Sequence, residues 1–257
     1  MGTAAAGRRG ITATLTALAA FAACWSCAAG VSAAAQIETR ASIRPSLLPN
    51  RLGASTALTL AFRFSGGPEG VPAPLRGMVV HLPAGLTVDL RNARVCRPSR
   101  LLGGGAGGCE PGSLVGRGHG LMKVHAGALP VAENTAVSIF RGPNRGSHQT
   151  LEILNQGSTP LDQRTIATGV LAPDGGRYGS KLTVSVPAIP TLVLEPDASF
   201  VSLSLTIGGV GRRPRAHAAA GSILVPRSCP ATGFPFAADF AFAGAAGASA
   251  GAAIACP

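Results

Sequence analysis

Apolar and polar residues alternate along much of the chain from residue 55 onward, and a period of two predicts β-strands. In residues 55–64 every second residue from Leu58 is Leu or Phe, with Thr, Ala and Arg between them. Residues 200–207 alternate most regularly, and residues 234–242 place four phenylalanines on one face. These segments are predicted to be half-buried strands, with one face toward a core and the other toward solvent.

Shorter runs of the same kind extend this prediction along the chain. They predict strands at residues 78–82, 86–90, 121–125, 135–140, 150–154, 166–171, 181–186 and 222–225. Clusters of Gly, Pro, Asn and Asp separate many of these runs and indicate turns. Residues 36–54, with Pro45 and Pro49, show no clear period and are interpreted as a lead-in. The Ala- and Gly-rich residues 243–253 are interpreted as a long hairpin loop.

About ten strands without a convincing amphipathic helix predict an all-β fold. We expect an antiparallel β-sandwich, of immunoglobulin-like or jelly-roll-like type, in which two sheets pack face to face. Residues 36–257 have a length that suits one such domain, and two β-rich halves joined near residue 130 are the alternative. The chain shows no repeat of fixed period, so a propeller or solenoid is not predicted.

The first 35 residues have the composition of an export signal. Arg8 and Arg9 precede an uncharged run rich in Ala, Leu and Thr. Small residues at 33–35 suit a cleavage site. A membrane anchor and a lipid anchor at Cys24 are the alternatives, but threonines dilute the apolar run. We therefore interpret residues 1–35 as a signal peptide and expect a secreted or cell-surface protein.

The charge of the chain bears on its partners. There are 22 Lys and Arg residues against 11 Asp and Glu residues, which gives a formal net charge of +11. A positive exported protein can bind an anionic cell-wall polymer or a membrane surface. The arginines are dispersed, however, and cluster only in residues 212–215. No stripe of aromatic and basic residues occurs, so nucleic acid is not an expected partner.

Four cysteines follow the predicted signal peptide, and they are Cys96, Cys109, Cys229 and Cys256. Four cysteines allow three connectivities. Proximity favours Cys96–Cys109 and Cys229–Cys256, as expected in an oxidising compartment. A metal site formed by all four thiolates is the alternative, but neither close pair has the C-x2-C spacing typical of zinc sites. We expect two disulfides and no cofactor.

No segment carries a strong catalytic signature. Ser113 lacks the G-x-S-x-G context of a nucleophile and is expected to bond its own turn. Glu195 and Asp197 bracket a proline and form only a weak candidate for calcium binding. The five histidines do not fall at metal-ligand spacing. The glycine run 103–108 lacks the lysine and helix of a phosphate-binding loop and is expected to be a loop closed by a disulfide.

The phenylalanine face of residues 234–242 is the one feature that suggests an apolar-ligand pocket. An ordinary hydrophobic core is the simpler interpretation of the same residues. A sugar-binding module is disfavoured because the only Trp, Trp25, lies in the predicted signal peptide.

Several short motifs, taken together, resemble a family. They include Leu82-Pro83-Ala84-Gly85-Leu86-Thr87, Cys109-Glu110-Pro111-Gly112-Ser113, Phe140-Arg141-Gly142-Pro143, Cys229-Pro230-Ala231-Thr232-Gly233-Phe234 and Cys256-Pro257. With the signal peptide, this set resembles a group of secreted, β-rich proteins of actinobacterial genomes. The resemblance implies an exported β-sandwich with two disulfides, and it transfers no activity and no functional residues.

The expected function is therefore a non-enzymatic binding protein or a component of the cell envelope. A secreted hydrolase acting on an extracellular polymer or ester is one alternative. A carrier of apolar ligands is another.

Overall fold

Strands make up most of the computed structural model, which describes residues 38–125, 129–159, 162–191, 194–209 and 222–257. The strands are β1 (Thr39–Leu48), β2 (Ser55–Gly66), β3 (Leu75–Pro83), β4 (Thr87–Asp89), β5 (Leu114–His125), β6 (Pro130–Arg141), β7 (Gln149–Gln156), β8 (Arg164–Pro173), β9 (Tyr178–Ser185), β10 (Ser199–Ile207), β11 (Ser222–Leu224), β12 (Phe234–Phe242) and β13 (Ala248–Ile254). Short helical turns are η1 (Pro68–Gly70), α1 (Pro98–Gly104) and η2 (Gly105–Gly108). Residues 35–257 form one compact unit. The predicted signal peptide and the arginine cluster at residues 212–215 lie outside the described residues.

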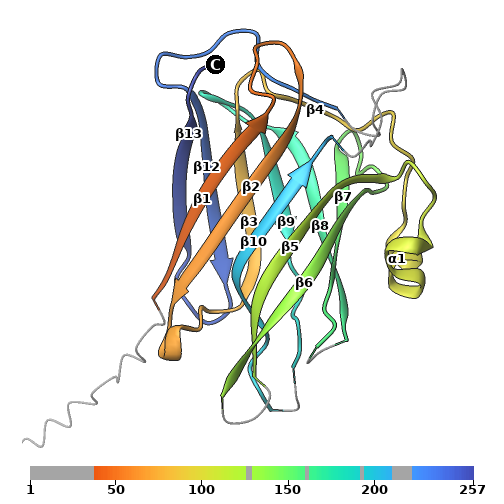
Figure 1. Cartoon of the computed structure of the whole chain (residues 1–257), viewed down its shortest axis with the longest axis vertical. Coiled ribbons are helices and arrows are strands. Elements are labelled where there is room, and N and C mark those ends of the chain that lie inside the picture. The colour runs from red at the N-terminus through yellow and green to blue at the C-terminus, as the bar shows by residue number, and fades with distance from the viewer. Residues whose placement is uncertain (1–37, 126–128, 160–161, 192–193, 210–221) are drawn as a thin grey trace, which may run out of the picture. The chain divides into compact units, whose positions relative to one another are not determined.

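All the strand pairs are antiparallel, and they join into one hydrogen-bonded sheet (Figure 1). Its order is β13-β12-β3-β9-β8-β7-β6-β5-β10-β2, and β1 pairs with the other edge of β2. The short strands β11 and β4 continue from the first residues of β2. The sheet turns back on itself, so that β1 and β13 lie side by side. The predicted all-β sandwich is confirmed, but its two layers are parts of a single sheet, not separate sheets.

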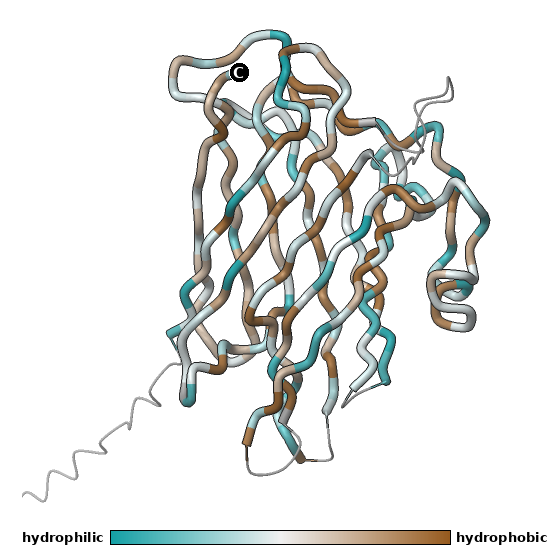
Figure 2. The backbone as a smooth tube through the Cα atoms, in the orientation of Figure 1, coloured by the Kyte–Doolittle hydropathy of each residue, from teal (hydrophilic) through white to brown (hydrophobic). Residues whose placement is uncertain are grey.

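The core lies between the two layers and is closed by aromatic side chains from β2 and β12. The ring centroids of Phe62 and Phe240 are 5.7 Å apart, and those of Phe64 and Phe240 are 5.1 Å apart, both edge to face. Burying one such side chain contributes about 1.5–3 kcal/mol. Figure 2 shows the alternation of apolar and polar residues that directs these side chains inward. The phenylalanine face of residues 234–242 is therefore packed core, as the simpler interpretation held.

Two segments interpreted as irregular are strands. In the predicted lead-in, β1 buries Thr39, Ile43 and Leu47 while its alternate residues face solvent. Pro45 is tolerated there because β1 pairs with β2 alone, and a proline can occupy an edge strand. In the predicted loop 243–253, β13 pairs with β12 along its length. Alanine gives a weak hydrophobic signal, which hid this strand in the sequence.

The position near residue 130, where two halves could have joined, lies within a hairpin. β5 ends at His125, β6 begins at Pro130, and the two strands pair along nearly their whole length. Strands β5 to β9 then follow one another as antiparallel neighbours. The sheet therefore continues across this position.

The loop between Cys96 and Cys109 is more ordered than its glycines predicted. The two cysteines form a disulfide with Cα atoms 5.6 Å apart, and the residues between them form α1 and η2. This corrects the expectation that the glycine run 103–108 is a plain loop. Leu101 of α1 packs with Phe140 and Leu154 in a second, smaller core. At Gly108 a Cβ atom would lie 2.1 Å from the carbonyl oxygen of Arg100, so close packing requires glycine there.

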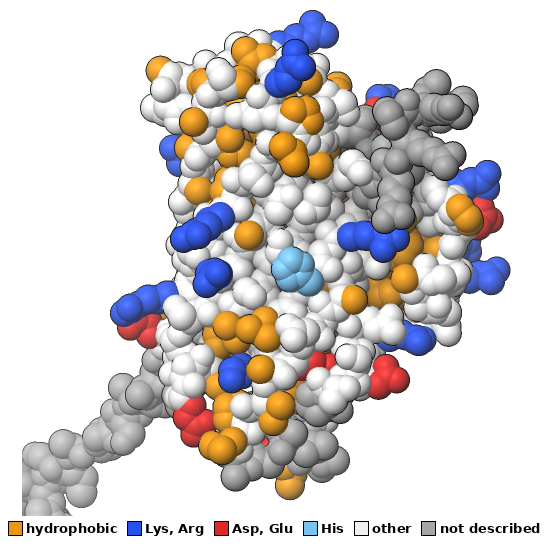
Figure 3. Space-filling model, in the orientation of Figure 1, with side chains coloured by type: hydrophobic (Ala, Val, Ile, Leu, Met, Phe, Trp, Pro, Cys, Tyr) orange, Lys and Arg blue, Asp and Glu red, His pale blue; other side chains and the backbone are white. Residues whose placement is uncertain are grey.

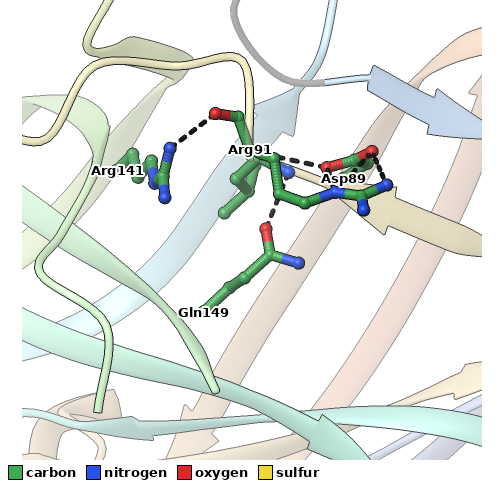
Figure 4. A network of polar contacts seen from close by, with 5 residues as sticks. Asp89, Arg91, Arg141 and Gln149 are labelled. Carbon is green, nitrogen blue, oxygen red and sulfur yellow. Dashed lines mark hydrogen bonds and ion pairs between the residues drawn. The ribbon is translucent and has the colours of Figure 1, made fainter. Parts of the chain in front are cut away.

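Arg141 bonds the segment that precedes the stapled loop to the sheet, and Figure 4 shows its contact with the carbonyl oxygen of Arg91. Its Nη1 donates to the carbonyl oxygens of Arg91 and Ala93, at 2.7 Å each. Its backbone carbonyl accepts the N–H of Cys96 at 2.8 Å, and its N–H donates to the carbonyl of Ser113 at 3.0 Å. The segments that lead into and out of the stapled loop are thus both bonded to one residue of β6.

We expect Arg141→Gln to lower the free energy of unfolding by about 2 kcal/mol, because two hydrogen bonds from a charged donor are lost. The measurement is urea denaturation followed by far-UV circular dichroism. Arg91→Gln is the matched control, because the Arg91 side chain forms only an exposed ion pair with Asp89. Such pairs contribute little. Equal stability of the Arg141 variant and the wild type would contradict this role.

Candidate functional site

The outer surface of β1, β2, β10 and β5 is basic, and we call it the basic face. Its cations are Arg40 and Arg44 of β1, Arg63 of β2, and Arg117 and Lys123 of β5. None of these four strands contains an Asp or a Glu. Outside them, Glu38 forms an ion pair with Arg40, in which both side chains are exposed. Arg40 is thus paired, while the other four cations form no ion pair with a described acidic residue, so the basic face carries a net positive charge.

The register of the sheet places these side chains in parallel rows, one row along the outer side of each strand. We call such a row a lane. Arg63 pairs with Ser202 of β10, and Arg117 pairs with Thr206. Ser204 lies between Ser202 and Thr206 on the same side of β10, and its partner on β5 is His119. Outward-facing residues on one strand are about 6.6 Å apart. A lane of hydroxyl groups on β10 therefore runs between cationic strands.

A depression of about 580 Å³ crosses this face, and its lining includes Arg40, Arg63, Ser42, Ser65 and Ser202. Figure 3 shows the same side of the molecule, with basic side chains spread over the surface. Guanidinium groups and hydroxyls donate hydrogen bonds to phosphate, sulfate and carboxylate oxygens. The arrangement can therefore hold an anionic group of a larger molecule.

Sequence reasoning described the arginines as dispersed, and the basic face was missed. The basic face could have been found by asking which basic residues are separated by an even number of positions on one strand, because such residues face the same side of the sheet. Arg40 and Arg44 share the solvent side of β1, which lies within the predicted lead-in. Residues 114–120, which hold Arg117 and His119, were not recognised as part of a strand because glycines interrupt the alternation.

A second polar cluster, also missed, surrounds His81 on the outer side of β3. Its Nδ1 lies 2.5 Å from Oδ2 of Asp174, and its Nε2 lies 3.1 Å from Oδ2 of Asp239. Ser249 donates to the other oxygen of Asp239 at 2.6 Å. A hydrogen bond from His81 lowers the pKa of Asp174, and hydrogen bonds from Ser249 and then His81 lower that of Asp239 despite desolvation.

This cluster does not have the order of a hydrolytic triad. A triad needs the imidazole in contact with the serine hydroxyl so that it can remove the proton. Here the carboxylate of Asp239 contacts both Ser249 and His81. The cluster instead ties β12, β3 and the end of β8 together. It provides no activated nucleophile for the hydrolase alternative.

The other residues singled out from the sequence have structural partners. Ser113 donates to the carbonyl of Glu110 at 2.6 Å within its own turn, as expected. Asp197 forms an ion pair with Arg76, so its carboxylate is not assembled with Glu195 around a cation. His148 bridges to Arg145 through the backbone. His217 and the side chain of His125 lie outside what the structure describes.

The cysteines have the pairing that proximity favoured. Cys229 bonds to Cys256 with Cα atoms 5.8 Å apart, and Cys96 bonds to Cys109. The alternative of a metal site with four thiolates is therefore wrong. In the described part of the chain, no group of three or more His, Cys, Asp or Glu side chains is arranged to hold a metal ion.

Comparisons with protein-family models, with curated proteins and with solved structures give no match. Within the described ranges, no helix is long and apolar enough to cross a membrane. Any assignment of function therefore depends on the geometry and charge of this chain.

Glu152 of β7 is a buried carboxyl on the outer side of the sheet, only 3% exposed. The hydroxyl of Thr168 donates to it at 2.9 Å. Burial raises its pKa above the ordinary value, although Thr168 and Arg145 act in the opposite direction. Between the ordinary and the raised pKa, the folded protein therefore binds more protons at this site than the unfolded chain does.

This difference predicts that Glu152 makes the protein less stable as the pH rises through that window. Gln can still accept the Thr168 hydrogen bond but carries no charge. We expect Glu152→Gln to be more stable than the wild type at neutral pH, and the difference to vanish below the ordinary pKa. Urea denaturation across a pH series is the measurement, with the exposed Glu110→Gln as control. Parallel stability curves for wild type and Glu152→Gln would show that the site does not titrate in this way.

Proposed function

We propose that the protein is an exported, non-enzymatic β-sandwich that binds an anionic polymer of the cell envelope through the basic face. The observation that carries this proposal is the basic face itself, where five cations on three strands have no acidic residue on the same strands. The hydroxyl lane of β10 adds neutral donors between them.

Export is the first part of the proposal. Two disulfides are typical of proteins that mature in an oxidising compartment. The composition of residues 1–35 and the resemblance to secreted actinobacterial proteins support the same location. Release by cleavage after residue 35 is proposed over retention through a lipid at Cys24.

A polymer fits the basic face better than a membrane surface does. Proteins that lie on lipid usually bury apolar side chains in the interface in addition to binding headgroups. The large exposed apolar side chains on these strands and the adjoining β6 lie near strand ends, at Leu48, Leu129 and Val131. The middle of the face presents mainly Ser, Thr, Arg and His119, with Leu121 and Val201 only partly exposed, and its polar groups suit the charged groups of an extended chain. Lipid vesicles are therefore the comparison that the experiment must include.

Attraction of this kind depends on salt. Binding of a polyanion releases condensed counterions, so the association constant falls as the salt concentration rises. Each Arg or Lys near an anionic surface contributes about 1 kcal/mol. Reversing two charges should therefore weaken binding strongly, and the location of the reversed charges should matter.

We expect the double variant Arg63→Glu, Arg117→Glu to bind dextran sulfate at least about thirtyfold more weakly than the wild type, because two attractive contributions of about 1 kcal/mol are lost and repulsion adds to that loss. The matched control is Arg97→Glu, Arg100→Glu, which changes the net charge equally on the exposed surface of the stapled loop. The measurement is fluorescence anisotropy of labelled dextran sulfate across a salt series, with neutral dextran as the blank.

Three outcomes would overturn the proposal. One is equal weakening in both double variants, because binding would then follow net charge and not the basic face. Another is no binding of the polymer by the wild type at low salt. The third is tighter binding to phosphatidylglycerol vesicles than to the polymer, which would assign the face to membranes.

A further inference from the structure

Inside the sandwich, away from the basic face, lies an apolar chamber with one polar wall. The chamber has a volume of about 30 Å³, and its lining includes Val137, Ile153, Phe200 and Asn155. A second space of about 10 Å³ adjoins it and shares Asn155, Thr165 and Ile189. Its lining also includes Glu133, Thr135 and Gln163, so we call it the polar vestibule.

Asn155 carries an unused hydrogen-bond acceptor at the junction of the two spaces. The residue is 9% exposed, and its Oδ1 is buried without a partner among the described residues. Its Nδ2 contacts the sulfur of Met122 at 3.6 Å. If the amide of Asn155 were flipped, its oxygen would face the Met122 sulfur, and both atoms are hydrogen-bond acceptors. The orientation with Nδ2 toward the sulfur is therefore the better one. A buried acceptor left unpaired costs about 1–3 kcal/mol, so the site favours an occupant that donates.

Glu133 adds a buried carboxyl group to the lining of the vestibule. It is 2% exposed, and one of its oxygens accepts the backbone N–H of Ser158 at 3.0 Å. No described Lys, Arg or His forms an ion pair with it. A buried carboxylate without a cation is costly. An occupant with a positive, donating end would satisfy Glu133 and Asn155, and an anionic one would be repelled.

The lining of the chamber shows where an occupant can enter, and the volume limits its size. Thr165 and Ala167 of β8 line the chamber and are nevertheless partly exposed, so solvent reaches this wall. One water needs about 10–15 Å³ in a comparable measure, and a cavity that binds benzene has about 150 Å³. At about 40 Å³ in total, the chamber and vestibule hold the equivalent of about three waters and have roughly a quarter of the volume of the benzene-binding cavity, so only the smallest organic cations fit and a fatty acyl chain does not.

We propose that this interior site binds a short primary alkylamine, with its hydrocarbon part in the apolar chamber and its ammonium group directed to Asn155 Oδ1 and Glu133. The site is separate from the basic face and does not depend on the function proposed for it. Affinity for so few atoms is limited to tens of micromolar at best.

The test is isothermal titration calorimetry of the full-length protein with propylammonium chloride, 1-propanol and sodium propionate. We expect propylammonium to bind best, propanol more weakly and propionate not at all. Glu133→Gln should weaken propylammonium binding at least about tenfold, which corresponds to the loss of one charged hydrogen bond, while changing propanol binding little. Asn155→Leu, which fills the junction and removes the acceptor, should weaken both.

Glu152→Gln is the matched control, because Glu152 is also a buried carboxyl of the sheet but does not line the chamber. Its affinity for propylammonium should equal that of the wild type. If Asn155→Leu does not fold, Glu133→Gln alone decides the question. Equal binding of amine and propionate, unchanged affinity in Glu133→Gln, or no binding at millimolar propylammonium would show that the site holds water only and that the proposal is wrong.

Discussion

The packing of β2 against β12 across the core is the constraint on which the rest of the structure depends. These strands are not hydrogen-bond neighbours, yet Phe62 and Phe64 meet Phe240 edge to face and bring distant parts of one sheet together. Once the sheet is closed in this way, every second residue of each strand is committed to the interior. The remaining residues form the outer surface, where core packing does not restrict the side chain, so these positions can carry groups that bind a ligand.

The two parts of that outer surface are used differently. The stapled loop covers part of β6, β7 and β8, where Leu101 packs on Phe140 and Leu154. Arg141 bonds the segments that lead into and out of this loop to the sheet. On β3 and its neighbours, the imidazole of His81 is within hydrogen-bond distance of the carboxylates of Asp174 and Asp239. Among the described residues, no segment covers the face of β1, β2, β10 and β5, and these four strands contain no acidic residue. The positive charge of this face is therefore available to a ligand.

The sequence predicted the part of the fold that depends on local pattern. Alternation over residues 55–64, 200–207 and 234–242 identified β2, β10 and β12, and proximity identified both disulfides. It missed β1 and β13 because proline and alanine weaken the hydrophobic signal. The basic face, the His81 cluster and the interior site each combine residues from strands distant in sequence, such as Arg63 and Arg117. Pairing of those strands is a property of the closed sheet that no single segment encodes.

The central claim is that an extended anionic polymer lies on the hydroxyl lane of β10. It is tested most directly by NMR titration of the isotope-labelled protein with dextran sulfate, following the backbone amides. The account predicts the largest chemical-shift changes at Ser202, Ser204 and Thr206 and at the neighbouring residues of β2 and β5, with little change on β12 and β13. Changes centred on the stapled loop or on the His81 cluster, with none on β10, would contradict it.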